Sequence, residues 1–153
     1  MNLEKAIKLA VEAHTGQVDK GGNPYILHPL RVMLSLDSEE ERIVGVLHDV
    51  VEDCEGWSWE RLKAEGCCEE IIEALQSVSK TPEDEAEYRA LPEDKKLDHY
   101  LEFIQRAKAN KIGRHVKAAD IRDNLDISRI DDITERDINR LNRYKKALRI
   151  LND

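Results

Sequence analysis

The chain has 153 residues, a hydrophobic content of 41% and a formal net charge of −8, which fits one globular domain over residues 1–153 with a sizeable core. The negative charge argues against nucleic-acid binding, which needs a basic face. No run approaches the roughly 20 apolar residues of a membrane span, and the N-terminus lacks a signal peptide's apolar region, so we expect a cytoplasmic protein with no membrane partner.

The first half of the chain carries helix signals joined by one glycine-rich loop. Apolar residues at helical spacing predict a helix over about 2–14, and the loop over about 15–26 follows. Pro29 is suited to the first turn of a short helix that ends near residue 36. Ser38 and Glu41 form a capping box for a helix that includes residues 44–54. Ser58 caps a further helix that Gly66 can end.

The second half continues the helical pattern. An amphipathic helix is predicted over about 69–80, and the very polar stretch 80–98 is expected to be mobile. Pro92 starts a helix that continues to about residue 109, another helix spans about 112–126, and Thr134 with Asp137 caps a last helix that ends near Leu151. The predicted fold is therefore all-α, a compact single-domain bundle of about eight helices.

The segment VGVLHDVVEDC, residues 44–54, places four titratable side chains in an apolar run. On a helical wheel His48, Asp49, Glu52 and Asp53 share one face with Gly45. An ordinary solvent-exposed acidic face is one interpretation. The alternative is a site, since a mid-helix glycine costs about 1 kcal/mol of helix propensity and could make room for a non-protein group.

A metal ion is the obvious candidate for such a group. Imidazole and carboxylate ligands suit Mn, Fe, Ni, Co or Zn, but His48 and Asp49 alone are not enough. His28 precedes Pro29, which favours extended geometry and can point the imidazole inward. A packed or capping histidine is the alternative interpretation of His28.

Asp120 is a second candidate ligand from outside the segment. It follows two alanines, and Lys117 and Asn124 share its helical face. Taken alone, Asp120 could equally be a surface acid. The remaining histidines are predicted to be structural: His14, His99 and His115.

The ordered set H…HD…D resembles the HD-domain superfamily of metal-dependent phosphohydrolases. The match is closer in four segments, AHTGQ, GGNPYILHP, LHDVVEDC and VKAADIRDN, which resemble the hydrolase domain of RelA/SpoT-type alarmone hydrolases. The resemblance extends from residue 1 to about residue 129. It implies the helical HD-domain fold and a small, stand-alone hydrolase.

The resemblance also implies roles for particular residues. The matched metal ligands are His28, His48, Asp49 and Asp120, and the family ion is usually Mn²⁺. Glu52 and Asp53 match the residues that position or activate the attacking water, and Asn124 matches a residue near the ribose and phosphate of the substrate. Lys20 and Lys117 are the basic residues expected to offset phosphate charge.

One position departs from the family pattern. These hydrolases carry an Arg-Lys pair after GQ, with the arginine packed on the guanine base, whereas this chain has Asp19 followed by Lys20. An aspartate cannot place a cation over an aromatic ring. The leading hypothesis is therefore a metal-dependent phosphohydrolase of a nucleotide, with guanosine 3′,5′-bis(diphosphate) (ppGpp) 3′-pyrophosphohydrolase activity tested first.

Three alternatives stay open from the sequence: an HD phosphohydrolase of a different nucleotide or phosphate ester, a non-catalytic nucleotide-binding HD protein, and a purely structural helical protein. The expected partner is a small phosphorylated nucleotide. The sequence leaves open the physiological substrate, the metal in the cell and whether the chain forms a homo-oligomer.

Overall fold

The structure is a computed structural model that describes residues 1–153. It contains ten α-helices, one 3₁₀ helix and no strand, so the predicted all-α class is confirmed. The elements are α1 Leu3–Ala13, α2 Leu27–Leu34, α3 Glu39–Leu47, α4 Val50–Asp53, α5 Trp59–Ala64, α6 Glu69–Val78, α7 Pro82–Ala90, α8 Glu93–Ala109, α9 Lys111–Asn124, η1 Ile127–Arg129 and α10 Glu135–Asn152. None of these helices is long and apolar enough to cross a membrane.

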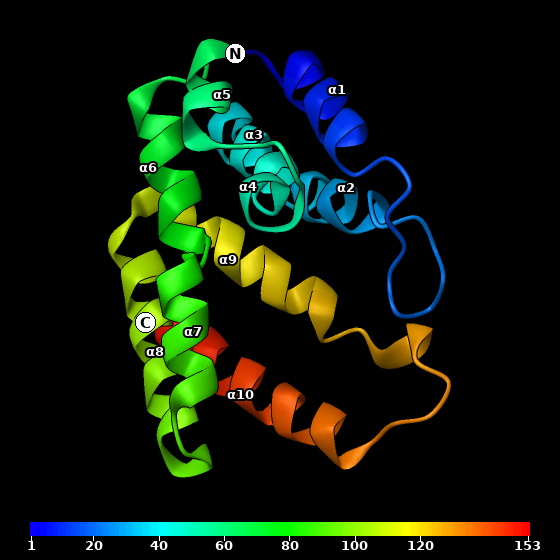
Figure 1. Cartoon of the computed structure of the whole chain (residues 1–153), viewed down its shortest axis with the longest axis vertical. Helices are drawn as coiled ribbons and strands as arrows, with labels where there is room; N and C mark the ends of the chain where they lie inside the picture. Colours follow the sequence, from blue (N-terminus) through cyan, green and yellow to red (C-terminus); the bar gives the residue numbers. More distant parts are fainter.

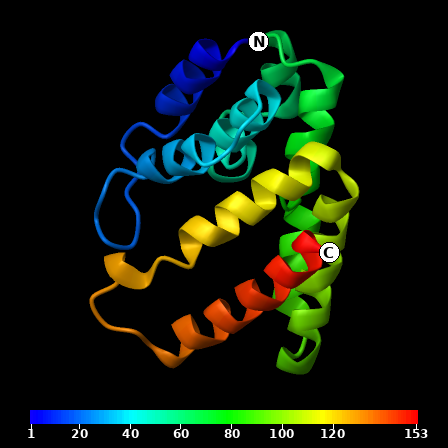
Figure 2. The same cartoon turned by 180° about the vertical axis from the view of Figure 1, so that it is seen from behind.

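Helix α3 lies at the centre of the bundle and contacts α1, α2, α6 and α9. Helix α9 runs between the α2–α3 pair and α10, as both views show (Figures 1 and 2). The apolar core joins side chains from most of the helices, including Leu47 of α3, Ile72 of α6, Ile104 of α8, Ile121 of α9 and Leu151 of α10. This packing fixes α2, α3 and α9 beside one another, and these elements carry the predicted metal ligands.

The helix expected through the segment 44–54 is interrupted. Helix α3 ends at Leu47 and the short α4 begins at Val50, so His48 and Asp49 lie at the junction between the two helices. The expectation that Gly45 makes room for a ligand is wrong. A Cβ atom at Gly45 would lie 2.7 Å from Leu36 Cδ1 and 3.4 Å from Met33 Cα, so the glycine instead allows α2 to pack closely on α3.

The polar stretch 80–98 folds into helices where we expected a mobile segment. Thr81 and Asp84 form a capping box, and Pro82 occupies the first turn of α7. No residue of α7 is buried, and after Pro92 the chain enters α8. Together with the separate α4, this raises the count from the predicted eight helices to ten.

Candidate metal centre

Four donor atoms from three parts of the chain come together at one point. His28 comes from α2, His48 and Asp49 from the α3–α4 junction, and Asp120 from α9. His48 Nε2 lies 3.0 Å from Asp49 Oδ2 and 3.6 Å from Asp120 Oδ1. His28 Nε2 lies 3.6 Å and 3.2 Å from the same two oxygens. The two imidazoles and two carboxylates therefore alternate around a closed ring.

The spacing of the ring fits a single divalent ion. Metal–ligand bonds of about 2.1 Å place neighbouring ligands about 3.0 Å apart in an octahedral site and about 3.4 Å apart in a tetrahedral one. The ring distances of 3.0–3.6 Å lie in this range. Ligand atoms of His28, His48 and Asp49 all lie within 4.8 Å of one another, whereas Asp120 lies outside this tighter group although its Oδ1 is 3.2 Å and 3.6 Å from the two imidazoles.

The orientation of the two imidazoles favours a cation between them. The Nδ1–H of His48 donates to the carbonyl oxygen of Gly45 at 2.7 Å, so its Nε2 carries a lone pair toward the carboxylates. That Nε2 atom is buried and has no hydrogen-bond partner. Burial alone would lower the pKa of His48, but the nearby carboxylates of Asp49 and Asp120 raise it well above its ordinary value. A positive charge is therefore stabilised at this point, and a divalent ion would supply it.

His28 is oriented by a residue that the sequence did not single out. Its Nδ1 lies 2.7 Å from Asp123 Oδ2, and a carboxylate there accepts the Nδ1–H. Arg31 Nε donates to the other oxygen of Asp123 at 2.8 Å, and Arg129 donates to the Asp123 carbonyl at 2.7 Å. Such outer partners fix the tautomer of a metal-binding histidine and strengthen it as a ligand.

The two carboxylate ligands also have outer partners. Tyr25 donates its hydroxyl hydrogen to Asp49 Oδ2 at 2.6 Å, a second contact that the sequence did not indicate. Asp120 Oδ2 accepts from Lys117 Nζ at 2.8 Å, and Asp120 Oδ1 accepts from the Asn124 amide at 2.8 Å. Burial would raise the pKa of Asp120, but the Lys117 charge outweighs it and holds the pKa well below its usual range. The predicted residues Lys117 and Asn124 thus lie at the candidate metal centre, in contact with Asp120.

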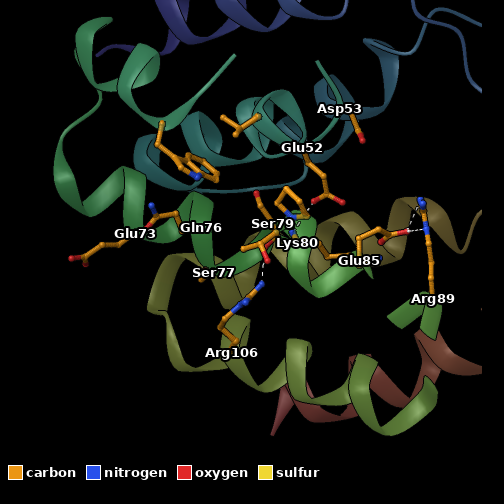
Figure 3. A pocket seen from close by; sticks show the side chains of 14 residues that line it. Glu52, Asp53, Glu73, Gln76, Ser77, Ser79, Lys80, Glu85, Arg89 and Arg106 are labelled. Atoms are coloured by element: carbon orange, nitrogen blue, oxygen red, sulfur yellow. Dashed lines mark hydrogen bonds and ion pairs between the residues drawn. The ribbon is translucent and has the colours of Figure 1, made fainter. Parts of the chain in front are cut away.

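Glu52 and Asp53, which follow the ligand Asp49 by three and four residues, line a cleft of about 980 Å³ (Figure 3). None of the four ring residues lines this cleft. Glu52 Oε2 accepts the backbone N–H of Lys80 at 2.9 Å, which holds this carboxylate in place. Desolvation raises the pKa of Glu52, and desolvation together with the charges of Asp49 and Glu52 raises the pKa of Asp53 to about 6. A carboxylate with such a pKa is suited to accepting a proton near neutral pH.

Asp19, at the position expected to contact the base, is engaged with its own loop. Asp19 Oδ1 accepts the backbone N–H groups of Gly21 and Asn23, both at 2.9 Å, so this carboxylate stabilises its own loop. Lys20 is exposed, makes no hydrogen bond or ion pair, and does not line the cleft that Glu52 and Asp53 line. The structure does not bring Lys20 together with the other predicted site residues.

No protein-family model matches the chain. Curated proteins do match parts of it. The chloroplast protein RSH1 of Arabidopsis thaliana is 39% identical over 84 residues, which cover 51% of this chain and 10% of that protein. A Myxococcus xanthus GTP pyrophosphokinase is 30% identical over 107 residues, or 67% of this chain and 14% of that protein. A Borreliella burgdorferi guanosine-3′,5′-bis(diphosphate) 3′-pyrophosphohydrolase is 36% identical over 83 residues, which cover 52% of this chain and 12% of that protein.

A solved structure matches nearly the whole fold. It is that of a metazoan ortholog of SpoT described as hydrolysing ppGpp, with a TM-score of 0.75 and 21% sequence identity, and the match covers 97% of this chain and 84% of the other. The fold is therefore that of the HD domains. The sequence matches show that the chain is similar to RelA/SpoT-type proteins, and it spans only about a tenth of the length of these curated relatives.

Proposed function

We propose that residues 1–153 form one HD hydrolase domain, a metal-dependent phosphohydrolase that acts on a nucleotide. The observation that carries this proposal is the ring of two histidines and two aspartates, in which a buried His48 Nε2 without a hydrogen-bond partner faces two carboxylates. The first substrate to test is ppGpp, with release of the 3′-diphosphate. The names of the relatives and of the structural neighbour support this choice.

The ring residues would hold the ion in this proposal: His28, His48, Asp49 and Asp120. A bound divalent ion, which the family resemblance suggests is Mn²⁺, supplies polarisation of the phosphoryl group and lowers the pKa of a coordinated water. Glu52 or Asp53 accepts the proton of the attacking water, and the raised pKa values of both carboxyl groups suit this role. Lys117 and Asn124 hold Asp120 in the orientation that the ring requires.

A second substrate class remains a serious candidate because of Asp19. Its carboxylate is engaged with the backbone of its own loop, and the exposed Lys20 is the one basic side chain at the expected base-binding position. This arrangement offers no cation to stack on guanine. We therefore propose another nucleotide or phosphate ester as the alternative substrate, with the metal chemistry unchanged.

The cytoplasm is the compartment we propose, since all three cysteines are unpaired.

The proposal is tested by measuring bound metal and the release of phosphate or diphosphate from a panel of nucleotides that includes ppGpp. Asp49→Ala removes one ligand and should lose metal and activity together. Asp132→Ala is the matched control, because Asp132 is exposed and makes no ion pair. Full activity of Asp49→Ala would refute the mechanism, and tightly bound metal without turnover on any substrate would indicate a non-catalytic binding protein.

A further inference from the structure

The link between α6 and α7 contains a peptide group whose two polar atoms contact different side chains. This peptide joins Ser79 to Lys80; α6 ends before it and α7 begins after it, so it belongs to neither helix. Its carbonyl oxygen accepts from Arg106 Nη2 at 2.7 Å, and its N–H donates to Glu52 Oε2 at 2.9 Å (Figure 3). One planar group therefore lies between the guanidinium of Arg106 and the carboxylate of Glu52.

The Ser79 side chain fastens one end of this link. Its hydroxyl lies 2.8 Å from the carbonyl oxygen of Leu75 and 3.2 Å from that of His48, and the residue is only 3% exposed. These contacts join the link to α6 and to the α3–α4 junction. The plane of the following peptide is fixed differently, by the partners of its own carbonyl and N–H groups.

Arg106 itself is held in place by neighbouring side chains. Its Nη1 and Nη2 both donate to Asp84 Oδ2 at 3.1 Å, and its guanidinium carbon lies 5.0 Å from the Phe103 ring centroid. Asp84 Oδ2 also accepts the N–H of Thr81 in the capping box of α7. The guanidinium is therefore oriented by the protein alone, at the wall of the cleft that Glu52 also lines.

A cation on the carbonyl side of a peptide strengthens the hydrogen bond on its N–H side. The charge of Arg106 draws electron density toward the carbonyl oxygen, which makes the N–H of the same peptide a better donor. The two bonds also constrain one plane, so a carbonyl that loses its partner lets the peptide rotate and turns the N–H away from Glu52. No hydrogen bond or ion pair joins Arg106 directly to Glu52, so its influence passes through the peptide.

We propose that Arg106 is a positioning residue, which acts through the Ser79–Lys80 peptide to hold Glu52 in the orientation for accepting a proton from the attacking water. The inference rests on the proposed phosphohydrolase function. It also separates the two candidate proton acceptors. Glu52 is the carboxylate with a fixed orientation, since Asp53 contributes only its backbone carbonyl to a hydrogen bond with another side chain.

Amide hydrogen exchange of the metal-free full chain tests this link without turnover. Arg106→Met keeps the aliphatic stem and removes the donor to the peptide carbonyl. The Lys80 N–H should then exchange about 5- to 10-fold faster, as expected for the loss of a hydrogen bond of ordinary strength. Glu52→Ala removes the acceptor and gives the exchange rate of the broken bond.

Asp84→Asn is the matched control for the exchange experiment. It breaks the ion pair between α7 and α8, as Arg106→Met does, but it keeps an oxygen for the Thr81 N–H and leaves Arg106 in place. Exchange of the Lys80 N–H should be the same as in the parent chain. Equal acceleration in Asp84→Asn and Arg106→Met would attribute the effect to the ion pair and overturn the inference.

With an active chain, steady-state kinetics on the best substrate of the nucleotide panel supply a second test. Arg106→Met should lower kcat about 10-fold or more and change KM by less than about 3-fold, with metal content unchanged. Arg106→Lys keeps a cation that can donate to the Ser79 carbonyl, so its kcat should lie closer to that of the parent chain. Asp84→Asn should keep the parent kcat.

The possible results separate this inference from the proposed function. A rise in KM with unchanged kcat in Arg106→Met would show that Arg106 contacts the substrate and would overturn the positioning role. Parent-like exchange and kcat in that variant would overturn it as well. An inactive chain in which Arg106→Met still frees the Lys80 N–H would refute the proposed function and leave the link between Arg106 and Glu52 intact.

Discussion

At the scale of single residues, each ligand of the ring is held by a partner outside it. Asp123 accepts from His28, the Gly45 carbonyl accepts from His48, and Tyr25 donates to Asp49. These contacts set which imidazole nitrogen or carboxylate oxygen of each ligand faces the ion. We therefore expect the outer partners to matter almost as much as the ligands.

Asp123→Ala tests this dependence. Loss of the carboxylate frees His28 Nδ1 and leaves Arg31 without its ion-pair partner. We expect Mn²⁺ affinity, measured by calorimetry, to fall about 10- to 100-fold with the ligands themselves unchanged. Asp131→Ala, at an exposed acid without an ion pair, is the control. Parent-like affinity in Asp123→Ala would show that His28 needs no such support.

Asp53 gives a prediction about pH. Its pKa is raised from 3.8 to about 6 in the folded, metal-free chain. The folded state then binds more protons than the unfolded state between about pH 4 and pH 6, so the free energy of unfolding falls as pH rises through this window. Asp53→Asn removes the charge and should raise the free energy of unfolding by about 1 kcal/mol above pH 7, limited by solvent screening at this exposed site.

The same substitution should have little effect near pH 4, where Asp53 is protonated in the folded chain. Urea unfolding at the two pH values measures the difference, and Asp131→Asn is the matched control. An equal gain at both pH values would mean that the charge of Asp53 is not the cause.

At the scale of elements, close packing of α2 on α3 positions His28 against His48. Gly45 allows this approach, because a Cβ atom there would lie 3.4 Å from Met33 Cα of α2 and 2.7 Å from Cδ1 of Leu36, which follows α2. The glycine thus permits close packing between the two elements that carry His28 and His48. Its cost in helix propensity, about 1 kcal/mol, is offset by the packing it permits.

Gly45→Ala should therefore destabilise the chain although alanine is the better helix former. We expect a net loss of up to about 2 kcal/mol in the free energy of unfolding, from overpacking of about 1–3 kcal/mol less a gain in propensity of about 1 kcal/mol. In a Leu36→Ala background the added methyl group has room, so Gly45→Ala should there be neutral or stabilising. A double-mutant cycle by chemical denaturation measures this coupling, and additive effects would contradict it.

Local sequence signals predicted most of the helices. The features that the sequence did not predict depend on tertiary contacts. The capping boxes at Ser38–Glu41 and Thr134–Asp137 are present as expected, because a cap depends on neighbours three residues apart. A similar capping box, Thr81–Asp84, begins α7, and this local signal could have predicted that helix. The ring partners Asp123 and Tyr25 had no local signal, since His28 and Asp123 are 95 residues apart.

At the scale of the whole molecule, the candidate metal centre brings together residues that are distant in the sequence. The ring draws on α2, the α3–α4 junction and α9, which are separated by up to about a hundred residues in sequence. An ion that binds the folded ring and not the unfolded chain must stabilise the fold. Without it, protonated imidazole and the Lys117 ammonium supply the positive charge that balances the two carboxylates.

Thermal unfolding with and without metal measures this effect. At a free Mn²⁺ concentration of 100 times Kd the gain is about 2.7 kcal/mol, which for a chain of this size raises Tm by about 5–10 °C over a chelator-treated sample. Asp120→Ala should lose most of the rise, and Asp132→Ala should keep it. A rise of the same size in Asp120→Ala would place the stabilising ion elsewhere.

Anomalous diffraction from a crystal of the full chain grown with Mn²⁺ tests the metal centre most directly. We predict one anomalous peak about 2.0–2.2 Å from each of the four ring atoms, His28 Nε2, His48 Nε2, Asp49 Oδ2 and Asp120 Oδ1. A well-ordered ring without a peak, or Mn²⁺ bound only at other residues, would contradict the assignment of these four residues as the metal ligands.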